Sequence, residues 1–118
     1  MLVSAYGSVS VKCRALLDGG SDCNLMTSCC RERLGLSILP TNINVVSLFL
    51  ASHNVNISVK ITLKSTCTDF QTDIQSLSVD RITSNLPPVD IDISLWYLPL
   101  ELAHADPDFH LANPIDII

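Results

Sequence analysis

The chain has little charge and few aromatic residues. Of its 118 residues, 16% are charged and 5% are aromatic, and the formal net charge is −5. The lysines and arginines are scattered along the sequence, so we expect neither a phosphate-binding face nor a nucleic-acid partner. No stretch reaches about 18 consecutive apolar residues, so we expect no membrane-spanning segment and no membrane partner.

Two further absences concern the cellular compartment. The opening residues, MLVSAYGSVS, lack the basic start and the long apolar centre of a secretory signal. The cysteine count is five, which is odd, and no pair has the spacing CxxC. These features predict reduced thiols and an intracellular, cytoplasmic protein.

What the sequence does contain is short apolar segments with the alternation of β-strands. Residues 55–63 carry Val, Ile, Val, Ile and Leu at every second position, which predicts one clean apolar face. One helix is expected over residues 24–36, starting at Asp22 or Asn24 and ending at Gly35. The other expected strands are 2–6, 9–17, 43–52, 54–65, 69–79 and 113–118, with turns at 7–8 and 53–54. The pattern predicts a single all-β domain, a barrel or a sandwich, over residues 1–118.

One acidic residue, Asp18, follows directly on an apolar run in the stretch VSVKCRALLDGGS, residues 9–21. Asp-Gly and Gly-Gly favour a plain β-hairpin turn, and by local chemistry that alternative stays open. Two features argue against it. The segment that follows has helical spacing, and Leu16 and Leu17 break the alternation as a strand buried on both faces would.

A carboxylate on a rigid turn next to glycines suits aspartic protease chemistry. Two carboxylates about 3 Å apart cannot both ionise, so one acts as general base on a water and the other stays protonated. Asp18 is the one acid in this sequence that follows an apolar run and precedes glycine. The second carboxylate must then come from a second copy of the chain, which predicts a two-fold homodimer with Asp18 of each chain at the axis.

Two segments carry a resemblance to a known family. VKCRALLDGGSDCNLMTSCCRERLGL (residues 11–36) and LAHADPDFHLANPIDII (residues 102–118) resemble the start and the end of the retropepsin-like aspartic protease domain of Pao/BEL-type retrotransposon polyproteins. The resemblance implies a closed β-barrel half of the pepsin/retropepsin type with one short helix, built to homodimerise. It also implies an endopeptidase that cleaves a polypeptide substrate and needs no cofactor and no metal.

The resemblance assigns site residues position by position. Asp18 is the catalytic acid, and the rest of the catalytic turn is Gly19, Gly20 and Ser21. The expected flap over the cleft lies within residues 46–53 and includes Ser47, Leu48, Phe49, Leu50 and Ala51. The expected strand behind the site includes Ile115, Ile117 and Ile118.

Three departures from the family pattern favour an alternative function. Gly19 stands where the family has serine or threonine, so the hydroxyl that would bond across the dimer axis is missing. No glycine lies between Gly35 and the C-terminus, so the flap is expected to be stiff. The chain ends at Ile118, where the family continues with glycine and a helix, so we expect a C-terminally truncated domain. The alternative is a catalytically inactive remnant that acts as a dimerisation or peptide-binding module.

Other residue groups favour structural interpretations. His104 and His110 flank Asp106 and Asp108, but Pro107 and the loop character favour a solvated turn over a metal site. A cysteine nucleophile near the predicted helix would need a histidine in reach, and packing of the cysteines in the core is favoured. The aromatic pair at positions 96 and 97 is expected in the core or in a cleft wall, and an aromatic binding platform is the second interpretation.

Overall fold

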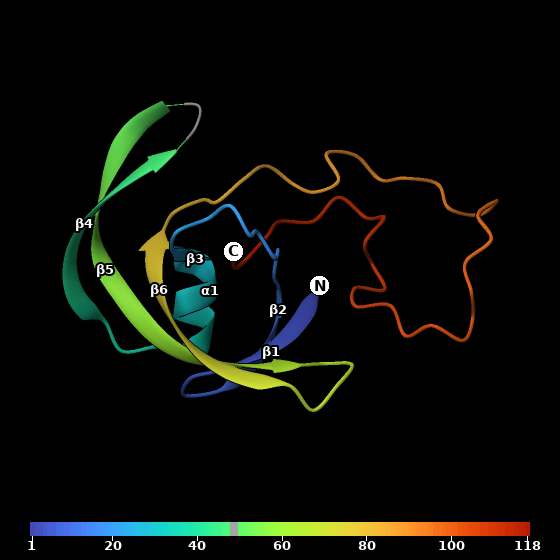
Figure 1. Cartoon of the computed structure of the whole chain (residues 1–118), viewed down its shortest axis with the longest axis horizontal. Helices are drawn as coiled ribbons and strands as arrows, with labels where there is room; N and C mark the ends of the chain where they lie inside the picture. The colour runs from blue at the N-terminus through green and yellow to red at the C-terminus, as the bar shows by residue number, and fades with distance from the viewer. Residues whose placement is uncertain (48–49) are drawn as a thin grey trace.

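The structure is a computed structural model that describes residues 1–47 and 50–118. In this part of the chain it is mostly β with one short helix, as the sequence predicts (Figure 1). The elements are β1 (Leu2–Tyr6), β2 (Ser10–Arg14), β3 (Asn24–Thr27), α1 (Ser28–Leu34), β4 (Leu39–Ser47), β5 (Leu50–Ser65) and β6 (Gln71–Val79).

The strands form one sheet in the order β2-β1-β5-β6-β3, with β4 paired to β5 outside this path. All neighbours are antiparallel except β3 and β6, which run parallel. The first half of β5 pairs with β4, and the second half pairs with β1 and β6. The predicted apolar face of β5 is confirmed, because Val55, Val59 and Ile61 are buried while Ile57 and Leu63 are half-buried.

The core lies where α1 packs against the curved sheet. Inward-facing side chains of β1, β2, β3 and β5 meet two side chains of the helix and one from the C-terminus. The buried cluster consists of Val3, Ala5, Cys13, Ala15, Met26, Cys30, Leu34, Val59, Ile61 and Ile117.

The strands themselves form an open sheet, so the closed barrel half that the resemblance implies stays a prediction. The two ends of the path, β2 and β3, are joined by isolated bridges at Ile117. This residue pairs in parallel with Ala15, just after β2, and antiparallel with Met26 of β3. The C-terminus therefore lies at the centre of the molecule, beside β3 and α1 (Figure 1).

The predicted helix is shorter than expected, since residues 24–27 form strand β3. Leu25 and Met26 fit both helical and strand spacing, and the pairing of β3 with β6 and with the C-terminus decides for the strand. Thr27 caps the helix instead of Asp22 or Asn24, with its side chain accepting the N–H of Cys30 at 3.2 Å. The predicted end at Gly35 is confirmed, and its φ of 60° is the left-handed value that favours glycine.

The predicted turn at His53 and Asn54 is wrong. Strand β5 runs through both residues, which pair with Val45 and Asn44 of β4. Because neither position is glycine or proline, nothing interrupts the extended backbone there. The pairing of β4 with β5 instead continues to Ser47 and Leu50, which pair with each other.

A long irregular segment, residues 80–114, separates β6 from the C-terminal segment, residues 115–118, which forms isolated bridges and no regular strand. It contains no helix or strand, although the structure describes all of it, and we call it the long loop. The β4–β5 hairpin and the long loop extend from opposite ends of the molecule (Figure 1). These extensions explain a radius of gyration of 15.3 Å, above the roughly 13.5 Å of a compact chain of this length. Within the described residues, no helix is long and apolar enough to cross a membrane.

Candidate active site

The Asp18 turn, residues 18–21, is ordered by its own hydrogen bonds. The Asp18 Oδ1 accepts the N–H of Gly20 at 2.9 Å, and the Asp18 carbonyl accepts the N–H of Ser21 at 3.3 Å. The Ser21 hydroxyl donates to the carbonyl oxygen of Cys23 at 2.6 Å. An aspartate that bonds the backbone two residues on stabilises a turn locally, so the carboxylate has a defined orientation.

The two glycines of the turn differ in the space around them. A Cβ at Gly19 would meet nothing within 4 Å, whereas a Cβ at Gly20 would lie 3.3 Å from the Asp18 Oδ1. Gly20 therefore leaves room for the carboxylate that its own N–H binds. Gly19 leaves open space where a side chain could stand.

The C-terminal segment, residues 115–118, holds the backbone on both sides of the turn. The N–H of Leu16 donates to the carbonyl of Ile117, and the N–H of Leu25 donates to the carbonyl of Ile118, both at 2.9 Å. Ile118 returns a bond from its N–H to the carbonyl of Leu25 at 3.0 Å. Of the predicted strand residues, Ile115 and Ile117 are buried and Ile118 is half-buried. Segments nearly a hundred residues apart thus meet directly beneath the turn.

The expectation of a strand buried on both faces before the acid is wrong for the single chain. Leu17 is 80% exposed and Leu16 is 39% exposed. Asp18 is exposed as well. The physical reason is that β2 ends at Arg14, so Leu16 and Leu17 lie on an irregular stretch outside the regular strands. The turn and the two leucines together form an accessible apolar and acidic surface.

Three of the predicted flap residues lie at the ends of β4 and β5 that pair with each other. Ser47 belongs to β4, while Leu50 and Ala51 belong to β5. Leu48 and Phe49 lie outside the described residues. The hairpin extends away from the core (Figure 1), and its role as a flap stays a prediction.

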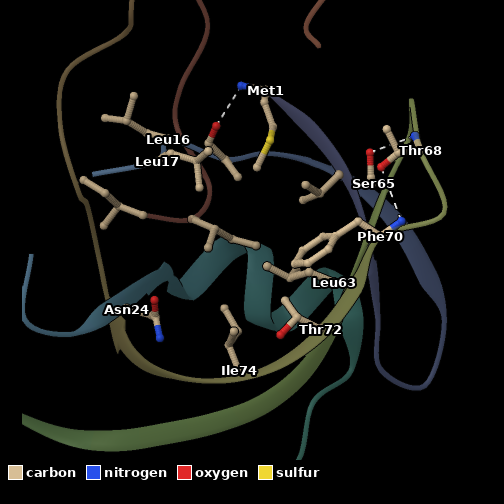
Figure 2. Close-up of a pocket in the computed structure, with 14 residues that line it drawn as sticks. Met1, Leu16, Leu17, Asn24, Leu63, Ser65, Thr68, Phe70, Thr72 and Ile74 are labelled. Atoms are coloured by element: carbon tan, nitrogen blue, oxygen red, sulfur yellow. Dashed lines mark hydrogen bonds between the residues drawn. The ribbon is translucent and has the colours of Figure 1, made fainter. Parts of the chain in front are cut away.

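An apolar cavity of about 480 Å³ opens beside the turn (Figure 2). Leu16 and Leu17 form one wall, and Phe70 and Leu63 lie across from them. Its other lining residues are Met1, Val3, Ala15, Asn24, Ser65, Thr68, Thr72, Ile74, Ile117 and Ile118. The exposed leucines before Asp18 therefore also line an apolar cavity.

A second hollow, of about 600 Å³, lies between the hairpin and the residues that follow β6. Along this hollow, residues 53–57 of β5 pair with β4 on one side and have no strand on the other side within the described part of the chain. The opposite wall is Val79, Asp80, Arg81 and Ile82. This groove combines a free strand edge with apolar and charged side chains.

Sequence reasoning missed a buried ion pair at Arg14. Its Nε donates to the Asp106 Oδ2 at 2.6 Å, and both side chains are nearly buried, with 11% and 8% exposed. Its Nη1 donates to the carbonyl oxygens of Leu86 and Asn113. The sequence feature that could have indicated this ion pair is the position of Arg14, directly before the apolar run that leads to Asp18.

The histidine and acid group at residues 104–110 does not form a metal cluster. Asp106 is bound to Arg14, and the rings of His104 and His110 pack against Phe109. No group of three or more histidine, cysteine or acidic side chains that could hold a metal occurs among the described residues.

The expectation for Trp96 and Tyr97 is wrong. Trp96 is half exposed and Tyr97 is almost fully exposed. Both lie in the long loop, which has no strand or helix to pack them against the core. Trp96 contacts Phe109, with ring centroids 6.4 Å apart, within the loop itself.

Three cysteines near the helix were expected to pack in the core, and one of them does so. Cys30 is buried, whereas Cys23 is half-buried and Cys29 is exposed. The partner of the buried thiol is another thiol, Cys13, at 3.3 Å.

No protein-family model, curated protein or solved structure matches this chain.

Proposed function

We propose that this chain is an aspartic endopeptidase of the retropepsin type, of the kind found in Pao/BEL retrotransposon polyproteins. It acts as a homodimer in which Asp18 of each copy supplies one carboxylate. The observation that carries the proposal is the position of Asp18. The carboxylate is exposed on a two-glycine turn, and the backbone before and after that turn is hydrogen-bonded to the C-terminal segment.

The chemistry follows from two such carboxylates meeting. At close distance they share one proton, so the ionised carboxylate takes a proton from a water while the protonated one hydrogen-bonds to the scissile carbonyl. The bond from the Gly20 N–H holds one oxygen of each Asp18 and leaves the other available. The water attacks the carbonyl carbon, and the peptide nitrogen receives a proton as the bond breaks.

Dimerisation also accounts for the apolar surface around the turn. Leu17 is largely exposed next to Asp18, which is unfavourable for a single chain in water. A two-fold axis at Asp18 brings the leucines of both copies together, and these leucines also line the apolar cavity of each copy.

The groove under the hairpin suits an extended polypeptide substrate. A peptide strand pairs with the free edge of β5 at residues 53–57, which supplies backbone hydrogen bonds independent of sequence. Asp80 and Arg81 on the opposite wall offer charges of both signs to substrate side chains.

A second candidate function rests on Gly19. Glycine has no side chain that could reach toward a partner copy. The space around this position in the single chain is also empty. A dimer that lacks this contact loses about 1–3 kcal/mol for each polar group left unpaired. The same fold then serves as a dimerising or peptide-binding module without catalysis.

The test is cleavage of an unstructured polypeptide at about pH 5, where a carboxylate pair shares its proton. We expect cleavage by the wild-type chain, inhibition by a pepstatin-type mimic of the transition state, and no cleavage by Asp18→Asn. Asp18→Asn keeps the size of the side chain, and circular dichroism checks that it is folded.

Gly19→Ser separates the two candidate functions. Gly19 does not have a positive φ and has free space around it, so serine fits without strain. Restoring the hydroxyl should raise the cleavage rate about tenfold, the rate equivalent of one hydrogen bond. A folded dimer that cleaves nothing even with Gly19→Ser supports the inactive module. A chain that stays monomeric in sedimentation experiments contradicts both candidates.

A further inference from the structure

Two buried thiols face each other across the core. Cys13 lies on β2 and Cys30 lies on α1, and their Sγ atoms are 3.3 Å apart. Both side chains are essentially inaccessible, with 1% and 0% exposed, and both are free thiols. The remaining cysteines, Cys23, Cys29 and Cys67, are half-buried or exposed.

The backbone holds both thiols in place. Cys13 pairs with Val3 in the β1–β2 ladder, and the N–H of Cys30 is bound by the cap residue Thr27. A disulfide needs an S–S distance of about 2.05 Å, so the sulfurs must approach by roughly 1.2 Å. The proposal requires that rotation of the two side chains supplies this approach while β2 and α1 stay in place.

The pair also has the acid–base asymmetry that thiol oxidation needs. The hydrogen bond from the Cys30 thiol lowers the pKa of Cys13, although burial opposes this shift. The same hydrogen bond and burial raise the pKa of Cys30. Because the thiolate is the reactive form, Cys13 is the first sulfur to react.

We propose that Cys13 and Cys30 form a redox modification site, at which a peroxide converts the two thiols into an internal disulfide. The Cys13 thiolate attacks one peroxide oxygen, so the O–O bond breaks and a sulfenic acid and water form. The Cys30 sulfur then attacks the Cys13 sulfur, the S–O bond breaks, and a second water leaves. The two thiols lose two electrons and two protons, and one hydrogen peroxide is reduced to two water molecules.

The disulfide would enclose the Asp18 turn. Residues 14–29, which lie between the two cysteines, contain the turn and strand β3. Oxidation therefore links β2 to α1 and restrains the ends of the segment that carries Asp18. This consequence follows from the positions of the cysteines and does not depend on protease activity.

The experiment uses the full chain with Cys23→Ser, Cys29→Ser and Cys67→Ser combined, so that the buried pair alone remains. After treatment with hydrogen peroxide under native conditions, we expect the intact mass to fall by two hydrogen atoms. Trypsin should then release residues 13–14 linked to residues 15–31, and a reducing agent should separate them. Closing a loop of this length should raise the Tm by roughly 10–15 °C. The wild-type chain is treated in parallel to show that the three substitutions did not create the reactivity.

The matched control adds Cys30→Ser to the triple variant. It should form no cross-link and should instead gain oxygen at Cys13. The same triple variant is also treated with peroxide in concentrated urea. This sample gives the rate at which the two thiols are oxidised in the unfolded chain. The proposal is overturned if the folded triple variant stays unmodified, or gains oxygen without a cross-link, at a peroxide concentration that oxidises the unfolded chain.

Discussion

The β-core and the long loop are stabilised by different interactions, although they belong to one chain. In the core, strand ladders satisfy the backbone and apolar side chains such as Leu34 and Val59 are fully buried. In the long loop, Leu95, Tyr97 and Leu100 are almost fully exposed, so apolar burial contributes little there. The comparison shows that a segment of this length can keep a defined path when a few polar contacts replace a core.

Arg14 supplies the main contacts between the two regions. Its guanidinium binds the Asp106 carboxylate and the carbonyl oxygens of Leu86 and Asn113, at both ends of the loop. Leu86 and Asn113 also pair with each other through the Leu86 N–H at 3.0 Å. One cation from the last position of β2 thus holds together the two ends of a segment that has no regular structure of its own.

The largest effect is expected for Arg14→Met. This change removes the charge and its donors while keeping much of the apolar stem, and it leaves the Asp106 carboxylate buried without its partner. Loss of one member of a buried ion pair costs about 3–5 kcal/mol. Urea unfolding should show that decrease in the free energy of unfolding, and hydrogen exchange should show lost protection in residues 85–113.

Arg33→Met is the matched control. Arg33 also pairs with an acid, Asp116, but at 3.4 Å and with a side chain that is 45% exposed. An exposed pair of this kind contributes less than about 1 kcal/mol. If both substitutions cost the same, Arg14 does not hold the long loop and the comparison between the two regions fails.

The second prediction tests the two regions with the same side chain. Leu34→Ala removes a fully buried leucine from the core and should cost about 2–5 kcal/mol. Leu100→Ala removes a fully exposed leucine from the long loop and should change stability by less than about 0.5 kcal/mol. Thermal and urea unfolding measure both. A large loss for Leu100→Ala would show that the loop is packed against another surface in solution.

Elements whose signals are local could be predicted from the sequence. The alternation of residues 55–63 predicted the apolar face of β5, and Gly35 predicted the end of the helix, because period and backbone freedom are properties of the segment itself. The start of the helix could not be predicted, since Leu25 and Met26 fit both periods. Their strand conformation depends on β6 and on the C-terminal segment, which are distant in sequence.

The contacts around the candidate site are also non-local. Arg14 and Asp106 are 92 positions apart. The sequence around either residue does not indicate that the two form an ion pair. Trp96 and Tyr97 were expected to be buried because aromatic side chains usually are. Their exposure follows from the lack of regular structure in the long loop, which composition does not reveal. The Asp18 turn could be predicted because its acid and glycines are adjacent, whereas the exposure of Leu16 and Leu17 depends on where β2 ends.

The smallest effect is expected for Asp90→Ala, which tests a contact within the long loop itself. The Asp90 Oδ1 accepts the N–H of Ala112 at 2.6 Å and so ties the outgoing part of the loop to the returning part. Both residues are away from the core, so its loss should cost about 1 kcal/mol or less. Hydrogen exchange should become faster at residues 110–113, while the protection of β5 and β6 stays unchanged. Asp92→Ala is the matched control, because the Asp92 Oδ1 accepts the N–H of the nearby Ser94 at 2.9 Å. Hydrogen bonds from the backbone and the side chain of Ser94 lower the pKa of Asp92. Faster exchange at residues 110–113 in both variants would mean that the loop depends on its charge in general, and not on the single contact across it.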